Sequence, residues 1–158
     1  MAKKPPSSTD AGILAVLRGT ALLADVGERT LAKIAQAARR RSYEEGDTVY
    51  EMGDPVENLY FVAAGKLRFA LGGGSRIEGG GSVILPGDIL GWAALVADLP
   101  RRIATVVSLD HSELLEIGGT AFLDILAGDP RAGFLVMQRL ARMIAQTFLE
   151  QSRRLSVS

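Results

Sequence analysis

The sequence predicts a mainly β domain, a sandwich or barrel of short strands flanked by helices and followed by one long helix. Three observations predict it. Short apolar runs alternate with turn signals from residue 43 to residue 117, apolar residues repeat at helical spacing before this region, and a long amphipathic run with a helix start signal follows it. Many short, closely spaced strands are typical of a sandwich or barrel. The 158 residues are enough for one such domain.

The first forty residues predict a tail and two helices. Residues 1–9 are rich in Lys, Pro and Ser, which predicts a disordered tail. Asp10 is a candidate N-cap for a short helix over residues 11–17, and apolar residues at helical spacing predict a second helix over residues 28–38. We therefore expect the N-terminal helices to occupy residues 10–40.

Residues 41–118 predict the strands. The apolar runs are TVYEM, NLYFVAA, KLRFAL, SVIL, IATVVSL and SELLEI. Turn signals such as Gly46-Asp47 and Gly87-Asp88 separate them. Two glycine triplets, at 72–74 and 79–81, predict a hairpin tip. They are not a dinucleotide-binding fingerprint, because that motif needs a strand before it and a helix after it.

Residues 119–158 predict two helices. Thr120 is a candidate cap for a short helix over residues 121–126. Asp129 followed by Pro130 is a start signal for a long helix that reaches about residue 154.

The long helix carries two apolar stripes. Val136, Leu140 and Met143 predict contact with the core of the domain. The other stripe has the alternating spacings of four and three that mark a heptad seam: Met137, Ala141, Ile144, Phe148, Gln151 and Leu155. Two apolar faces need two partners, so we expect a homodimer through this helix. The alternative is a helix that is wholly buried within one subunit.

Charge and residue usage exclude several classes of function. Eighteen Lys and Arg balance eighteen Asp and Glu, whereas sequence-independent nucleic-acid binding needs a positive excess. We expect no direct DNA binding. We interpret Arg39, Arg40 and Arg41 as partners of the last carbonyls of the second helix.

The chain has no cysteine and one histidine, His111, in a turn between strands. This excludes thiol catalysis and cysteine or histidine metal clusters, and no Ser/His/Asp constellation is present. We expect no enzyme and no metal site, with His111 solvated. No apolar run reaches the length of a membrane span, and no secretory signal precedes the domain, so we expect a cytoplasmic protein that does not contact a membrane.

Glycine motifs follow one another in a specific order: Gly46-Asp47-Thr48-Val49, Gly53-Asp54, Leu59 to Gly65, and Gly87-Asp88-Ile89-Leu90-Gly91. In this order they resemble the cyclic nucleotide-binding domain of the catabolite-activator/FNR superfamily, over about residues 20–155. The resemblance implies a β-roll, or jelly-roll barrel, whose following helix dimerises and covers the ligand pocket. Related transcription factors continue into a helix-turn-helix domain. The sequence stops at Ser158, so we expect one stand-alone sensor domain over residues 10–158.

The resemblance also implies a phosphate cassette around residues 87–105. Gly91 matches the cassette glycine, and Ala93 and Ala94 match the short helix whose amides receive an anion. Arg102 matches the arginine that contacts the phosphate.

Two cassette positions depart from the family pattern. Trp92 stands where the family has a glutamate that accepts from the ribose hydroxyl, and Ile103 stands where it has a Ser or Thr that bonds a phosphate oxygen. Each unpaired polar group costs roughly 1–3 kcal/mol of binding. We therefore expect weak or no ordinary cyclic AMP binding. Trp92 either fills a degenerate pocket or forms a stacking platform for another ligand.

On the long helix, Gln151 and Ser152 fall where relatives contact a base, and a register-setting role in the seam is the alternative for Gln151. The expected function is a regulatory sensor of a cyclic nucleotide or another anionic small molecule, without a defined cofactor. A regulatory protein is a candidate partner. The alternative is a ligand-free dimerisation or scaffold protein with a degenerate pocket.

Overall fold

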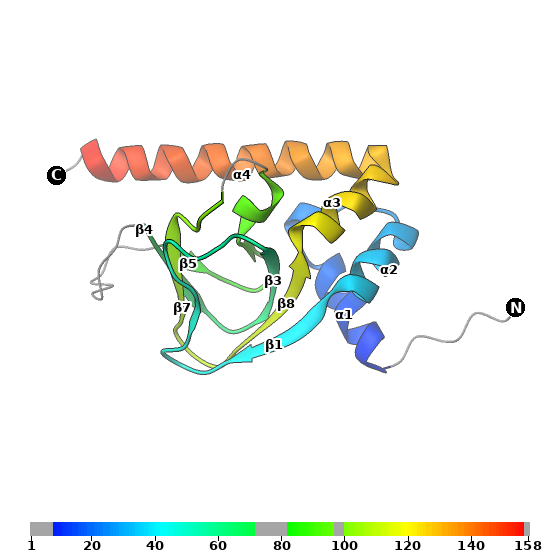
Figure 1. Cartoon of the computed structure of the whole chain (residues 1–158), viewed down its shortest axis with the longest axis horizontal. Coiled ribbons are helices and arrows are strands. Elements are labelled where there is room, and N and C mark those ends of the chain that lie inside the picture. Colours follow the sequence, from blue (N-terminus) through cyan, green and yellow to red (C-terminus); the bar gives the residue numbers. More distant parts are fainter. Residues whose placement is uncertain (1–7, 72–81, 97–99, 157–158) are drawn as a thin grey trace, which may run out of the picture.

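The computed structural model describes residues 8–71, 82–96 and 100–156, and Figure 1 shows a strand roll with helices at one end and one long helix along its top. The helices are α1 (Ser8–Arg18), the 3₁₀ turns η1 (Ala21–Leu23) and η2 (Trp92–Leu95), α2 (Glu28–Ala37), α3 (Gly119–Ala127) and α4 (Pro130–Ser156). The strands are β1 (Arg39–Tyr43), β2 (Thr48–Tyr50), β3 (Asn58–Ala64), β4 (Leu67–Leu71), β5 (Ser82–Ile84), β6 (Ile89–Leu90), β7 (Ala104–Ser108) and β8 (Ser112–Gly118).

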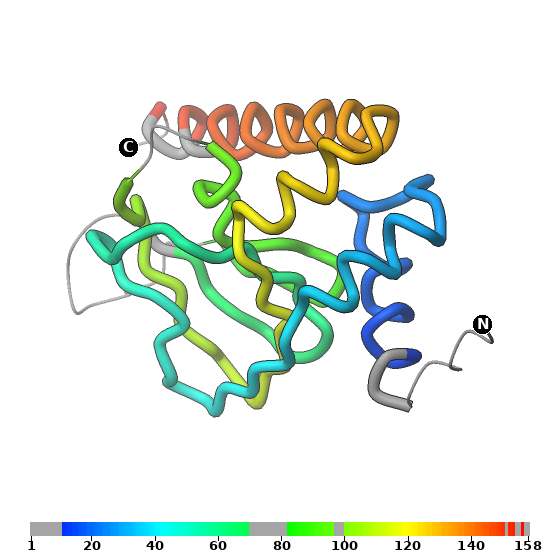
Figure 2. The backbone as a smooth tube through the Cα atoms, turned by 45° about the vertical axis from the view of Figure 1, so that its right-hand side comes forward, coloured from blue at the N-terminus to red at the C-terminus, as the bar shows by residue number. Residues whose placement is uncertain are grey.

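The strands form two antiparallel four-stranded sheets, in the orders β1-β8-β3-β6 and β2-β7-β4-β5. The tube trace in Figure 2 follows the same chain from a second side. The expected fold class is confirmed: mainly β with flanking helices, a β-roll, and a long C-terminal helix.

Strand β3 is apolar from Leu59 to Ala64 because both of its faces pack against a core. Tyr60 and Val62 face the interior of the roll, whereas Leu59 and Phe61 pack against the helices. Alternate side chains of a strand point to opposite faces. The uninterrupted run NLYFVAA therefore belongs to a central strand with a core on each side.

Three Gly-Asp pairs close the turns of the roll in the same way. In each, a glycine with φ near +90° precedes an aspartate. Only a residue without a Cβ adopts such a φ at low cost. The aspartate amide donates to the carbonyl three residues earlier, and its carboxylate accepts from the amide of that same residue, as in Asp47 with Glu44, Asp54 with Glu51 and Asp88 with Leu85. The repeated Gly-Asp motif is thus a turn device of the roll.

The core stripe expected on α4 is confirmed, because Val136 and Leu140 are buried and Met143 packs against the same cluster. Asp129 caps α4 as expected, accepting from the Ala132 amide at 3.2 Å. Its second carboxylate oxygen accepts from the Thr30 hydroxyl of α2 at 2.5 Å. The start of α4 is thus fastened to the N-terminal helices.

Two expectations about helix ends were wrong. Asp10 is not an N-cap, because α1 begins at Ser8, inside the stretch expected to be a disordered tail. Thr120 is not the cap of α3, which begins at Gly119 after Gly118. The pairing of Asn58 on β3 with Gly118 carries β8 to the helix start, and this contact overrides the local capping signal.

Arg39–Arg41 were also misplaced, since they form strand β1 and do not cap α2. β1 is an edge strand paired with β8, where Arg40 and Arg41 form ion pairs with Glu113 and Glu116. The two-residue strand β6 was not predicted. The expected hairpin tip at the glycine triplets lies outside the described residues.

Candidate functional site

The cassette expected from the sequence is built where β6 ends. Gly91 follows β6 with φ +79° and is the N-cap of η2. A Cβ at this position would lie 2.8 Å from the Asn58 carbonyl oxygen and 3.0 Å from Nη1 of Arg102. Gly91 is therefore required both by its left-handed backbone and by the close approach of its neighbours.

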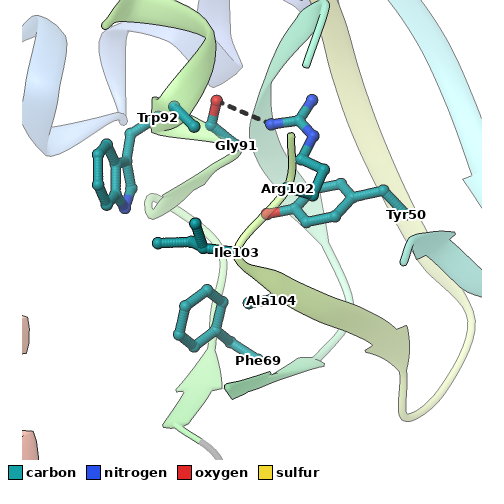
Figure 3. Close-up of a pocket in the computed structure, with 8 residues that line it drawn as sticks. Tyr50, Phe69, Gly91, Trp92, Arg102, Ile103 and Ala104 are labelled. Carbon is teal, nitrogen blue, oxygen red and sulfur yellow. Dashed lines mark hydrogen bonds between the residues drawn. The ribbon is translucent and has the colours of Figure 1, made fainter. Parts of the chain in front are cut away.

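Arg102 is buried, with 4% of its surface exposed. Its Nη1 donates to the Gly91 carbonyl at 3.2 Å and its Nη2 donates to the Asn58 carbonyl at 2.6 Å. Its Cζ lies 4.2 Å from the centroid of the Tyr50 ring, within reach of a cation–π interaction. Figure 3 shows the guanidinium beside the Gly91 carbonyl and the Tyr50 ring. The charged group thus holds together β6, the start of β3 and the end of β2.

The groups around Arg102 are neutral. Burial raises the pKa of Tyr60 to about 12, and burial also raises the pKa of Tyr50. Neither phenol ionises near neutral pH, so neither supplies a counter-charge. Within the described part of the chain, no carboxylate forms an ion pair with Arg102, and its Nε is buried without a hydrogen-bond partner. The cation is held by carbonyl dipoles and an aromatic face.

Trp92 and Ile103 line a small cavity next to this arginine. Trp92 is half-buried and packs against the helical core, while Ile103 is 41% exposed. The cavity has a volume of about 10 Å³ and is lined by Tyr50, Phe69, Gly91, Trp92, Ala93, Arg102, Ile103 and Ala104. Such a volume is about that of a single water site. In Figure 3 the indole of Trp92 and the guanidinium of Arg102 point to opposite sides of the cassette.

The structure therefore brings the cassette residues together. Gly91, Trp92, Ala93, Arg102 and Ile103 share the cavity lining, and Ala94 donates its amide to the Gly91 carbonyl at 3.0 Å. Ser152 is half-buried on α4 and does not line the cavity. The side chain of Gln151 lies outside those that the structure describes.

Two partners of Arg102 were missed from the sequence, namely Tyr50 and the carbonyl of Asn58. Simple alternation would not have placed Tyr50 in the interior of the roll, because Thr48 is exposed, Tyr50 is buried and the register of β2 shifts between them. A backbone carbonyl carries no sequence signal, so the contact with Asn58 depends on the pairing of β3 and β6.

The expected seam of α4 is divided between the core and solvent. Met137 and Ile144 pack partly against the core, Ala141 is exposed, and Phe148 is 71% exposed. The side chain of Leu155 lies outside those described. Phe134 is 68% exposed and precedes Ala141 by seven residues, as Ala141 precedes Phe148. The heptad spacing would have revealed Phe134, which extends the seam by one repeat.

Other sequence expectations concern groups outside the cassette. In the described residues, no three His, Cys, Asp or Glu side chains gather where they could hold a metal ion. His111 is exposed in the turn between β7 and β8, and its Nδ1 lies 2.9 Å from a carboxylate oxygen of Glu44. None of the helices that are described has the length and apolar character needed to cross a membrane.

Comparison with known proteins gives a consistent result. Residues 40–129 match the family described as "Cyclic nucleotide-binding domain". The cAMP-dependent protein kinase regulatory subunit of Debaryomyces hansenii is 30% identical over 110 residues, which are 70% of this chain and 23% of that protein. The Cyclic AMP receptor protein of Thermus thermophilus is 30% identical over 115 residues, 71% of this chain and 51% of that protein. The chain thus spans about half, or less, of these relatives.

A solved structure of a regulatory domain is also similar to this chain. The regulatory domain of Toxoplasma gondii PKA, crystallised with cAMP, is similar with a TM-score of 0.62 and 28% identity, over 77% of this chain and 46% of that one.

Proposed function

Because the chain belongs to the cyclic nucleotide-binding domain family, we propose that it is a non-catalytic regulatory domain whose pocket does not bind cyclic AMP in the usual way. The observation that carries the proposal is the engagement of Arg102. Both of its terminal nitrogens donate to backbone carbonyls, and the adjoining cavity is about 10 Å³. A phosphate at the cassette would have to compete with the Gly91 and Asn58 carbonyls for this guanidinium.

The substitutions at Trp92 and Ile103 act in the same direction. Trp92 cannot accept a hydrogen bond from the ribose hydroxyl, as the glutamate of the family pattern does. Ile103 cannot donate one to a phosphate oxygen, as the Ser or Thr of that pattern does. Each missing partner costs about 1–3 kcal/mol, which is about tenfold or more in affinity. The exposed Ile103 also adds an apolar side chain at the edge of the cavity. A different ligand that stacks on Trp92 is compatible with this lining, and ordinary cyclic AMP is disfavoured.

Trp92 is the only tryptophan, so its fluorescence reports on the cassette directly. We expect no saturable change when the protein is titrated with cyclic AMP or cyclic GMP at micromolar concentration. Other nucleotides and small anions test for a different ligand. A saturable response to cyclic AMP in that range would contradict the proposal.

A gain-of-function variant gives a second test. The double substitution Trp92→Glu and Ile103→Thr restores the family residues, and isothermal titration calorimetry should then detect cyclic AMP binding. Arg101→Ala, next to the cassette arginine but exposed, is the matched control and should leave the double variant unchanged. If neither the wild type nor the double variant binds any nucleotide or anion, the ligand-free scaffold is the better description.

We also propose that the domain pairs with a second copy through α4. The supporting observation is the exposure of Phe134 and Phe148 on one heptad stripe, with the small Ala141 between them. Between residues 145 and 153, none of the described side chains is buried, so this part of α4 gains little from its own domain. A shared seam would remove both phenylalanine rings from water.

Sedimentation velocity tests this pairing. Phe148→Glu places a charge in the proposed seam and should shift the protein from dimer to monomer. Gln146→Glu adds the same charge at an exposed site off the seam and should not. A Phe148→Glu protein that sediments as the wild type would contradict the pairing.

A further inference from the structure

Helix α4 concentrates positive charge in a chain that is neutral overall. It contains five of the eighteen basic residues and one of the eighteen acidic residues. The remaining residues therefore hold thirteen basic against seventeen acidic side chains, a formal charge of −4 that offsets +4 on α4. The chain is neutral as a whole, but its positive charge is concentrated on α4 and its negative charge on the rest of the chain.

Three of these arginines form a row on the outer surface of α4. Arg131, Arg142 and Arg153 are exposed and follow one another at intervals of eleven residues. Eleven residues are close to three turns of an α-helix, so the three side chains leave the helix in nearly the same direction. None of them forms an ion pair with another described side chain. We call these three residues the arginine row.

The arginine row lies beside the proposed seam and does not coincide with it. Relative to Phe134, Arg142 is rotated by about 80° around the helix axis, whereas Ala141 and Phe148 stay within about 40° on its other side. A partner helix seated on the phenylalanines would leave Arg142 and Arg153 accessible. The row is therefore a separate surface with its own partner chemistry.

The matching negative surface is present on the same chain. Residues 44–57 contain no Lys, Arg or His and carry six exposed carboxylates: Glu44, Glu45, Asp47, Glu51, Asp54 and Glu57. We call this stretch the acidic segment. Figures 1 and 2 place its first part, the turn between β1 and β2, at the end of the roll far from α4. The carboxylates of this turn therefore lie too far around the molecule to meet the arginine row of their own chain.

We infer that the arginine row of one copy docks against the acidic segment of a second copy. Complementary charge on two different surfaces of one chain makes a head-to-tail contact, in contrast to the self-complementary seam. Exposed ion pairs are individually weak, so the contact depends on several of them together and on low ionic strength. The inference does not rest on ligand binding or on the α4 seam.

Charge exchange tests the inference by sedimentation velocity at about 10 mM and about 1 M salt, where the screening length is about 30 Å and about 3 Å. We expect the wild type to form larger species at low salt that dissociate at high salt, with the association constant falling about tenfold or more. Arg142→Glu with Arg153→Glu should abolish these species, and so should Glu45→Lys with Glu51→Lys. The protein with all four substitutions should regain them, because it has the two charges exchanged.

A matched control changes the net charge by the same amount as Arg142→Glu with Arg153→Glu, but at another place on the surface. Arg29→Glu with Lys33→Glu, both exposed on α2, should leave the salt-dependent species in place. The inference is overturned if the wild type shows no salt-dependent association, if this control abolishes it equally, or if the fourfold exchange does not restore it. It is also overturned if Arg142→Glu with Arg153→Glu abolishes binding to anionic lipid vesicles but leaves the salt-dependent association of the protein unchanged. Phe148→Glu separates the seam from this contact, because it removes the seam and spares the charges.

Discussion

The Arg102 guanidinium lies 4.2 Å from the centre of the Tyr50 ring while it donates to the carbonyls of Gly91 and Asn58. An arginine in this position of the family pattern is expected to serve a phosphate. Here it joins three strands of the roll, and its surroundings contain two protonated tyrosines. The residue therefore contributes to the stability of the domain in the absence of any ligand.

The first prediction follows from that contact. Arg102→Met keeps an apolar stem but removes every donor, which leaves two buried carbonyls with fewer partners. We expect the free energy of unfolding in urea to fall by about 2–4 kcal/mol. Arg101→Met, at the exposed neighbour, should stay within about 0.5 kcal/mol of the wild type. Equal, small losses for both variants would show that Arg102 has no structural role.

The second prediction separates backbone strain from steric conflict. Gly46 and Gly91 both have positive φ, but a Cβ at Gly46 meets open space, whereas one at Gly91 meets the Asn58 carbonyl at 2.8 Å. Gly46→Ala should cost about 1–2 kcal/mol, the price of a left-handed residue. Gly91→Ala should cost at least about 3 kcal/mol, because β3 or η2 must also move. Urea unfolding measures both, and similar losses would mean that the cassette is loosely packed.

The sequence identified the fold because its signals are local. The Gly-Asp pairs close turns through contacts within four residues, and short apolar runs between such turns mark most of the strands. The residues expected to form the cassette lie together, since Gly91 and Arg102 both line the cavity, but their role in binding stays a prediction. The state of Arg102 was not predictable, because its partners are backbone carbonyls brought close by the pairing of distant strands.

Charged residues at element ends were the least predictable. Arg39–Arg41 follow a helix in the sequence and resemble side chains that bind its last carbonyls. They form an edge strand because β8 offers both backbone partners and the carboxylates of Glu113 and Glu116. Tertiary pairing of this kind overrides local preference, and no short-range pattern reveals it.

The third prediction concerns the tie between α2 and α4. The Thr30 hydroxyl and then the Ala132 amide hold the pKa of Asp129 below its ordinary value of 3.8. A carboxyl group with a depressed pKa stabilises the folded state fully above its unfolded-state pKa, and this contribution is lost as the pH falls through the folded-state pKa. Asp129→Asn should therefore be less stable than the wild type at neutral pH, and the difference should shrink below about pH 4.

Unfolding in urea at a series of pH values measures that difference. Asp124→Asn, at an exposed site on α3, provides the control, and its difference from the wild type should not follow the same course. A gap between Asp129→Asn and the wild type that stays constant down to about pH 2 would contradict the assignment of the tie to the ionised carboxylate.

The fourth prediction concerns Arg139, which fastens α4 to η1 and to the two residues after it. Its guanidinium donates to the carbonyls of Leu22 and Ala24, and its Nη2 lies 2.9 Å from a carboxylate oxygen of Asp25. Asp25 is the only described residue other than glycine with positive φ, at +65°. Its side chain is 81% exposed, so the ion pair contributes at most about 1 kcal/mol. A non-glycine residue in the left-handed backbone conformation lowers stability by about the same amount or more.

At Asp25 the ion pair with Arg139 stabilises the fold, whereas the left-handed backbone destabilises it. Three variants distinguish these two contributions. Asp25→Gly loses the ion pair but relieves the backbone, so its unfolding free energy should match or exceed that of the wild type. Asp25→Ala loses the ion pair and keeps the strain, so it should be less stable by up to about 1 kcal/mol. Arg139→Ala should cost about 1–3 kcal/mol even in the Asp25→Gly background, because the two carbonyl contacts are lost in either case. If Arg139→Ala costs nothing once Asp25 is glycine, the ion pair alone holds α4 at this point.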